Sequence, residues 1–391
     1  MVLVQGNKEE LFQYVRTFDL DKIPSLKSII DRYNWTCINI NELLKIITTD
    51  NNFLLIDTRS EKEFDNSSIP FSLNFPVLST EERHNVGLIY KKYSKMAALK
   101  LALEYAEPKK ESLKLFLKKN NAANKNILVN CWRGGGRSSY LAKMVCDLGY
   151  KPATLIEGFK SYRNKVFEFF SKQEFLYDLI ELSGLTGTGK TELIKAVVNN
   201  FPVIDLELAA RHFSSLFGFV PYKIKNYTPV ANQSAFENNI FSQIVKNNKY
   251  FPNHNTFLIE SESKKVGDFL IPKPLYEKLQ HTPTIRVECS FNNRIERIVK
   301  DYFGNDNEGI PEMKKIFMKS ERFFRQQLSN PVYDDLLTKL QSANVNEFTE
   351  IMINKYYDIR YKEKPKNPLL IVNSDNFVAA VKELTEFLIN Q

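Results

Sequence analysis

Short apolar runs alternate along the chain with segments whose hydrophobic residues recur at helical spacing. The runs 53–56 and 127–129 are apolar and bounded by polar residues, as buried strands are. Segments such as 140–145 follow them with the periodicity of helices. This alternation predicts an α/β protein with parallel sheets. The expected divisions are a helical N-terminal extension (1–36), an α/β domain (37–165), a helical linker (166–175) and a second α/β domain (176–391).

A cysteine on a glycine-rich loop lies between the apolar run 127–129 and the helical segment 140–145. The loop contains Cys131, Arg133 and Arg137 around three consecutive glycines. Inward-pointing backbone N–H groups, a helix N-terminus and two arginines together favour a reactive thiolate. Such a loop binds a tetrahedral oxyanion or carries a chalcogen atom. A small buried cysteine is the simpler interpretation, but it explains neither the glycines nor the arginines.

A second loop matches the G-x4-G-K-[S/T] pattern and lies between a predicted strand and a predicted helix. Its backbone is expected to surround a pyrophosphate, with Lys190 bridging the oxygens and the Thr191 hydroxyl placed to hold Mg²⁺. The pattern does not indicate which phosphorylated compound binds. The phosphate-binding residues expected here are Gly184, Gly187, Gly189, Lys190 and Thr191.

Two carboxylates follow the predicted strand 255–259. Glu260 and Glu262 stand two positions apart, so on a strand end they face the same way, toward the phosphate loop. They are candidate metal ligands or acids. The alternative is that they are solvated loop charges.

Composition narrows the class of protein. With 391 residues and 43% hydrophobic residues, the chain is long enough for two or three domains with cores of their own. It lacks a long apolar stretch or a signal-peptide pattern at its start, and its four cysteines suit a reducing compartment, so a cytoplasmic protein without a membrane partner is expected. The net charge of +8, together with two anion-binding loops, favours a nucleic-acid substrate.

The segment around the Cys131 loop resembles a rhodanese domain. Asp57 and Arg59 form the Asp-x-Arg of that family and are expected to pair and brace the loop, and Glu63-Phe64 and Asn74 follow in the family's order. Ser68 stands where the family usually has histidine. Five residues separate Cys131 from Arg137, one more than usual, as in the Cys-x5-Arg loop of tyrosine phosphatases. The wider loop favours a phosphate or selenophosphate over a bare sulfur atom.

A rhodanese-like domain followed by a P-loop NTPase-like α/β domain resembles the tRNA 2-selenouridine synthases. Besides both loops, the resemblance covers Arg211-His212, Glu260-Ser261-Glu262 and Tyr356-Tyr357-Asp358. Lys264-Lys265 stands where the family usually has paired arginines. The resemblance does not extend to residues 1–36.

The resemblance implies a two-step reaction on tRNA with 2-thiouridine at the wobble position, in the family the tRNAs for Lys, Glu and Gln. Geranyl diphosphate would first S-geranylate the uridine, and selenium from selenophosphate would then replace the geranylthio group. Cys131 would carry selenium as an S-selanyl intermediate while Arg133 and Arg137 hold phosphate. No tightly bound cofactor is implied, although Mg²⁺ suits Thr191. Arg211, His212, Lys264, Lys265 and Arg294 are expected on loops that contact tRNA or anions.

Other functions stay open at this point. Cys-x5-Arg-Ser also fits a cysteine phosphatase or a sulfurtransferase fused to a nucleotide kinase-like domain, but Asn130 replaces the histidine usual before a phosphatase cysteine. A non-enzymatic tRNA-binding or GTP-switch protein would leave Cys131 unexplained. Five phenylalanines are candidates for an isoprenoid pocket, with a core role as the alternative: Phe213, Phe217, Phe219, Phe236 and Phe241.

Overall fold

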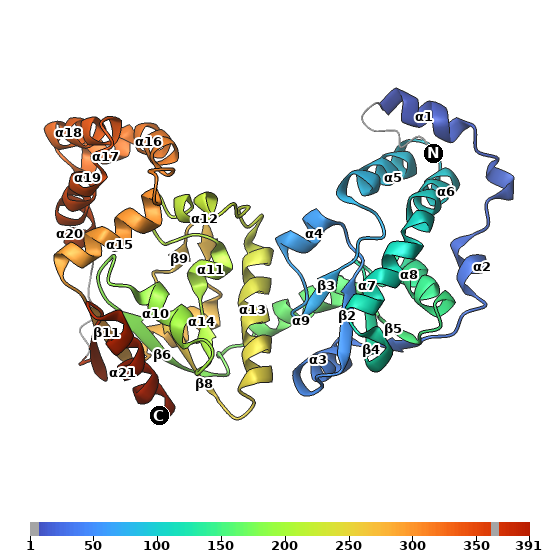
Figure 1. The fold of residues 1–391 in the computed structure, drawn as a ribbon, viewed down its shortest axis with the longest axis horizontal. Helices are drawn as coiled ribbons and strands as arrows, with labels where there is room; N and C mark the ends of the chain where they lie inside the picture. Colours follow the sequence, from blue (N-terminus) through green and yellow to red (C-terminus); the bar gives the residue numbers. More distant parts are fainter. Residues whose placement is uncertain (1–7, 361–366) are drawn as a thin grey trace. The chain divides into compact units, whose positions relative to one another are not determined.

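The computed structural model describes residues 8–360 and 367–391, and the parts of the predicted extension and second domain at 1–7 and 361–366 lie outside these ranges. It divides into an N-terminal unit, Met1–Phe167, and a C-terminal unit, Glu168–Gln391. Both are α/β units built on parallel five-stranded sheets, which agrees with the predicted fold class (Figure 1). None of the described helices has the length and apolar character that crossing a membrane requires.

The N-terminal unit has the strand order β1-β5-β4-β2-β3, with all neighbouring strands parallel. Its central strand β4 is buried along most of its length because Ile127, Leu128 and Val129 are covered on both faces, as is usual in parallel sheets. The strands are β1 (Thr36–Ile38), β2 (Phe53–Asp57), β3 (Ser72–Asn74), β4 (Asn126–Asn130) and β5 (Pro152–Leu155). The helices are α1 (Lys8–Arg16), α2 (Leu26–Ile30), α3 (Ile40–Thr49), α4 (Glu61–Asn66), α5 (Thr80–Lys92), α6 (Lys95–Ala106), α7 (Lys110–Lys119), α8 (Gly136–Asp147) and α9 (Gly158–Phe170), with short 3₁₀ turns η1 (Leu20–Lys22), η2 (Glu107–Lys109) and η3 (Ala122–Asn124).

Three helices, α5 to α7, are inserted between β3 and β4. Helix α5 begins at a capping box in which Ser79 and Glu82 each bond the other's backbone N–H. Leu11 and Val15 of α1 pack with Ile89 of α5 and Leu101 of α6 in one apolar cluster. The predicted N-terminal extension is therefore partly built into this unit.

The C-terminal unit has the order β12-β11-β6-β8-β7, again all parallel, plus the antiparallel pair β9 and β10. A second apolar cluster holds α15 to α19 together around Phe317 and Phe324. The strands are β6 (Asp178–Ser183), β7 (Val203–Ile204), β8 (Thr256–Glu260), β9 (Lys265–Val266), β10 (Phe269–Leu270), β11 (Thr284–Glu288) and β12 (Leu370–Asn373). The helices are α10 (Lys190–Val197), α11 (Leu206–Ala210), α12 (Val220–Ile224), α13 (Gln233–Tyr250), α14 (Lys273–Gln280), α15 (Phe291–Phe303), α16 (Ile310–Lys319), α17 (Glu321–Gln327), α18 (Asn330–Gln341), α19 (Val345–Met352), the π-helix η4 (Ile353–Tyr357), α20 (Asp358–Arg360) and α21 (Phe377–Ile389).

The prediction of a helical linker at 166–175 is wrong in its bounds. Helix α9 begins at Gly158, immediately after the turn that follows β5, and ends at Phe170, so that residues 171–175 are not helical. The helix starts early because its first backbone N–H groups, from Phe159 and Lys160, bond to the carbonyls of Cys131 and Trp132.

Candidate active sites

Cys131 follows β4 directly, and its side chain is buried under its own loop, residues 131–137. The Gly135 N–H donates to Sγ at 3.3 Å, and the Ser138 hydroxyl lies 3.2 Å from the same sulfur. Helix α8 begins at Gly136, so the sulfur also lies at a helix N-terminus. The Gly135 N–H group and the positive end of a helix therefore both face Sγ, which agrees with the backbone donor and the helix N-terminus that the sequence predicts for this loop.

Two glycines allow the loop to close against α9. Gly134 and Gly158 have positive φ angles of 65° and 56°. A Cβ on Gly158 would lie 2.2 Å from the carbonyl oxygen of Cys131, which is far inside van der Waals contact. Only glycine fits this position without moving the cysteine's backbone.

A buried ion pair braces the loop from β2. The Arg59 guanidinium donates to the Asp57 carboxylate at 2.7 Å, and both side chains are almost fully buried, which confirms the predicted pair. The guanidinium also lies 3.7 Å from the centre of the Phe159 ring, and that ring stacks on Trp132. Arg59 thus reaches the Cys131 loop through an aromatic contact.

The two arginines of the loop differ in their surroundings. Arg137 donates to the Glu63 carboxylate at 2.7 Å, and Arg83 pairs with the same carboxylate at 3.0 Å. Burial raises the pKa of Glu63, but Arg137 and Arg83 outweigh it, so this pKa lies below its ordinary value. Arg133 is exposed and makes no ion pair within the described part of the chain. It is the loop arginine open to an incoming anion.

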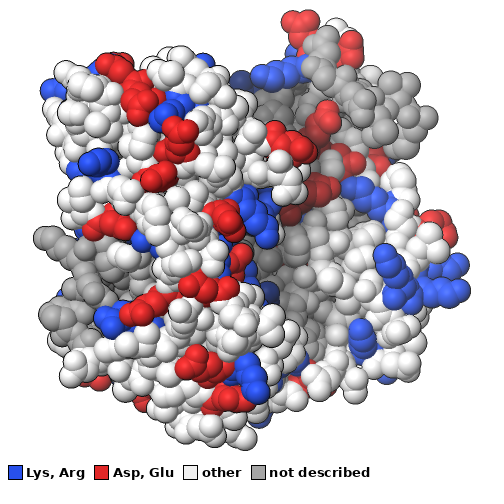
Figure 2. Space-filling view, turned by 60° about the vertical axis from the view of Figure 1, so that its left-hand side comes forward, with Lys and Arg blue, Asp and Glu red and all other residues white. Residues whose placement is uncertain are grey.

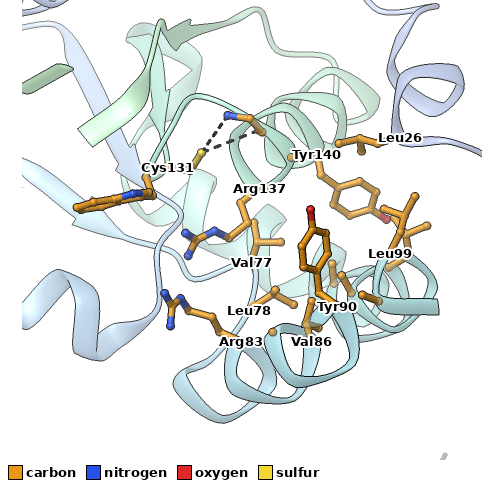
Figure 3. A pocket seen from close by; sticks show the side chains of 18 of the residues that line it. Leu26, Val77, Leu78, Arg83, Val86, Tyr90, Leu99, Cys131, Arg137 and Tyr140 are labelled. Carbon is orange, nitrogen blue, oxygen red and sulfur yellow. Dashed lines mark hydrogen bonds between the residues drawn. The ribbon is translucent and has the colours of Figure 1, made fainter. Parts of the chain in front are cut away.

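A cavity of about 780 Å³ opens beside the loop (Figure 3). Arg83 and Arg137 lie at the end near Cys131. The remainder is lined mainly by apolar side chains of α5 and α6. We call this cavity the Cys131 groove.

The phosphate loop, residues 184–191, joins β6 to α10 as predicted. Gly184, Gly187 and Gly189 all have positive φ angles, and a Cβ on Gly187 would lie 2.9 Å from a carbonyl oxygen of α15. The Lys190 ammonium donates to the carbonyls of Gly184 and Leu185 at 2.6 and 3.0 Å. Burial lowers the pKa of Lys190. The lysine therefore folds back over the loop that it would use to hold a diphosphate.

Three carboxylates gather beside Thr191. Glu207, Glu260 and Glu262 each offer an oxygen within 4.8 Å of the others, and Glu207 accepts a hydrogen bond from the Thr191 hydroxyl at 2.8 Å. Burial is the main cause that raises the pKa of all three, that of Glu262 to about 8, and repulsion by Glu207 adds to it at Glu260 and Glu262. Oε1 of Glu260 has no hydrogen-bond partner among the described residues. A cluster of three carboxylates offers the oxygen ligands that a hard divalent cation such as Mg²⁺ prefers.

Glu207 is not among the metal ligands predicted from the sequence. It lies just after β7, which has only two residues, too few for a strand pattern. The available signal was its place in the acidic segment Asp205-Leu206-Glu207, directly after an apolar pair. The phosphate loop and the three carboxylates line one cavity of about 770 Å³, together with Arg286, Arg297, Tyr357 and other residues.

Family models match both units. The tRNA 2-selenouridine synthase AAA domain matches residues 177–386, more than half of the chain, and a rhodanese-like domain matches residues 39–165. The chain belongs to the tRNA 2-selenouridine synthase family.

Relatives that carry this family name span both units. A tRNA 2-selenouridine synthase from Pseudomonas syringae pv. tomato is 32% identical over 334 residues, which are 80% of this chain and 88% of the relative. One from Shewanella denitrificans is 26% identical over 78% of this chain and 87% of the relative. A solved N-terminal domain of a putative ATP/GTP-binding protein from Clostridium difficile is 31% identical over 34% of this chain and 98% of that domain, with a TM-score of 0.31.

The basic residues predicted to contact tRNA in this family member occupy different environments. Arg294 is not on a loop: it lies in α15, is almost fully buried, and donates to the Asp358 carboxylate and to the Thr186 carbonyl. It therefore holds the phosphate loop in place, and the prediction of a loop position is wrong. Lys264 and Lys265 are both exposed, but Lys265 is the first residue of β9 and therefore does not lie on a loop as predicted.

Arg211 and His212 follow α11. Arg211 ends this helix with a positive φ of 50° and donates to the Thr228 carbonyl and hydroxyl. His212 is partly buried against Gly218 and Gly267, and burial lowers its pKa, so its ring is neutral near pH 7. A neutral imidazole does not add positive charge to a surface that would bind tRNA.

Across the face seen in Figure 2, basic and acidic side chains lie side by side.

The five phenylalanines do not form an isoprenoid pocket. Phe217, Phe236 and Phe241 are buried core residues, and Phe217 packs in the helical cluster of α15 to α19. Phe213 alone of the five lines the phosphate-loop cavity. The spacing of these aromatic residues therefore reflects packing in the core and not a ligand pocket.

Proposed function

We propose that the protein converts 2-thiouridine at the wobble position of tRNA into 2-selenouridine. Family membership supports the overall conversion. The observation that carries the proposal is that one chain combines a cysteine loop, with an N–H donor and a helix N-terminus at the sulfur, with a phosphate loop beside three carboxylates. The two sites suit two successive reactions at the same uridine.

The first reaction is S-geranylation by geranyl diphosphate at the phosphate loop. The uridine sulfur forms a bond to C1 of the geranyl group, and the C1–O bond breaks with diphosphate leaving. Lys190 and the loop N–H groups would neutralise the charge that grows on this leaving group. Mg²⁺, held by Thr191, Glu207, Glu260 and Glu262, would supply further positive charge there.

The second reaction is exchange of the geranylthio group for selenium at the Cys131 loop. A C–Se bond forms at C2 of the uridine, the C–S bond breaks, and geranyl thiol leaves with a proton, while water takes the phosphoryl group of selenophosphate as phosphate. This exchange is redox neutral overall. A selanyl group on Cys131 would add two redox steps to this exchange. A disulfide would accept two electrons when the S–Se bond forms, and thiols would return two electrons when selenide is released.

Mass spectrometry of tRNA nucleosides tests the proposal. Wild-type protein, 2-thiouridine tRNA, geranyl diphosphate and selenophosphate should yield 2-selenouridine. Cys131→Ala should accumulate the S-geranyl nucleoside, and Lys190→Ala should block its formation by orders of magnitude yet still convert pre-made S-geranyl tRNA. Normal 2-selenouridine from Cys131→Ala, or equal loss of both steps in folded Lys190→Ala, would refute this division of labour.

A further inference from the structure

The Cys131 groove is polar at the end near Cys131 and mainly apolar along the rest, although His84, Lys91 and Lys95 also line it. Cys131, Arg83 and Arg137 mark the polar end (Figure 3). The apolar part is lined by side chains from α2, α5, α6 and α8. Those labelled in Figure 3 are Leu26, Val86, Tyr90, Leu99 and Tyr140. A cavity that continues directly from the reactive sulfur into apolar surface suits a ligand with an anionic head and a hydrocarbon tail.

Small residues keep this groove open. Gly87 lies in the middle of α5, where a glycine weakens a helix relative to any ordinary residue. A Cβ at Gly87 would meet no atom within 4 Å, so no close packing requires the glycine. Ala98, Ala102 and Ala106 line the groove from one side of α6. Gly87 therefore lowers the stability of α5 at a position where a longer side chain would project into open space.

The chemistry of the second reaction says what must lie beside Cys131, and this step rests on the proposed function. The uridine carbon that gains the C–Se bond is the same carbon that loses the C–S bond, with the electron pair leaving on sulfur as the thiol. The alkyl chain on that sulfur is therefore only a few bonds from the selenium. A site that brings selenium to this carbon must also accommodate the chain.

We propose that the Cys131 groove binds the prenyl chain of S-prenylated 2-thiouridine during selenium exchange. The chain would lie between α5 and α6, against Leu99 and Val86, while Arg83, Arg133 and Arg137 face the phosphates of the tRNA and of selenophosphate. The product has lost the chain and with it this anchor, which favours release of selenylated tRNA.

A series of variants at Gly87 tests the proposal in the full chain. The substrates are tRNA carrying either S-geranyl or S-methyl 2-thiouridine, each with selenophosphate, and the readout is kcat/KM for 2-selenouridine formation. We expect wild type to prefer S-geranyl by about tenfold or more, since even one methylene in an apolar pocket can give that factor. Gly87→Ala, Gly87→Leu and Gly87→Phe should lower this preference progressively, and Gly87→Phe should remove it.

Lys92→Phe is the matched control, because it places the same ring on an exposed position of α5 outside the groove. It should keep the wild-type preference. Since replacing a helix glycine raises helix propensity, the Gly87 variants should unfold at no lower temperature than wild type. A wild type that selenylates both substrates equally, or a Gly87→Phe protein that retains the preference, would overturn the groove assignment alone. A wild type that selenylates neither substrate would overturn the proposed function as well.

Discussion

Raising the pH should destabilise the C-terminal unit unless Mg²⁺ is present. Burial and the neighbouring Glu207 carboxylate raise the pKa of Glu262 from an ordinary 4.5 to about 8. Between these two values the folded protein binds more protons than the unfolded chain does. The stability from this protonation is therefore fully present below pH 4.5 and is lost as the pH rises through about 8.

The size of the effect follows from the pKa shift. One proton bound only by the folded state changes stability by about 1.4 kcal/mol per pH unit. Glu262 is only partly buried, so we take about half of this value, ~0.7 kcal/mol per unit, to allow for screening by water. From pH 5 to pH 8 the loss is then about 2 kcal/mol, and the unfolding midpoint of a domain of this size should fall by about 4–8 °C.

Calorimetry of the full chain at several pH values measures this fall. Both tryptophans, Trp35 and Trp132, belong to the N-terminal unit, so tryptophan fluorescence identifies the transition of that unit. Mg²⁺ competes with protons for the carboxylates. It should therefore raise the unfolding midpoint of the C-terminal unit more at pH 8 than at pH 6. Glu262→Gln should flatten the pH dependence and weaken the Mg²⁺ response. An unchanged slope in Glu262→Gln, or a midpoint independent of pH without Mg²⁺, would refute the reasoning.

Substitutions at two further places test other parts of the structure. Arg59→Ala leaves Asp57 buried without its partner and should lower the stability of the N-terminal unit by about 3–5 kcal/mol. The loss is measured by tryptophan fluorescence as a lower unfolding midpoint of that unit. Arg59→Lys should lower the stability less. Changing Lys264 and Lys265 together to Glu should weaken tRNA binding and reduce its dependence on salt, measured by titration at several ionic strengths; unchanged affinity would place the tRNA elsewhere.

The sequence predicted the two loops well because strand ends and glycines leave strong local signals. Buried parallel strands are short, apolar and continuous, so their ends could be located to within about two residues. The glycines of the phosphate loop and Gly134 are required by positive φ angles, which few other residues adopt. The pairing of Asp57 with Arg59 could also be anticipated, since two opposite charges two positions apart at a buried strand end have little choice of partner.

The remaining features depend on contacts between distant segments. Glu207 joins the carboxylate cluster only because β7 pairs with β8, and a two-residue strand gives no periodic signal. Arg294 looked like a surface arginine, but its ion pair with Asp358 joins segments that are 64 residues apart. The Cys131 groove arises where α5 and α6 pack near the loop, and neither helix contains a recognisable motif.

The two sites differ in the charged side chains that they would offer to an anion. At the Cys131 loop, Arg83 and Arg137 share the single carboxylate of Glu63, which leaves a positive balance even before Arg133 is counted. At the phosphate loop, Lys190 lies beside three carboxylates whose raised pKa values favour their protonated forms, and Arg286 and Arg297 line the same cavity. We therefore expect a divalent cation to displace protons from these carboxylates and so favour diphosphate binding at the second site, whereas the Cys131 loop already offers arginines to an anion. Under the proposed function, a selenium anion at Cys131 would be stabilised by the Gly135 N–H group and by the nearby arginines, without a metal ion.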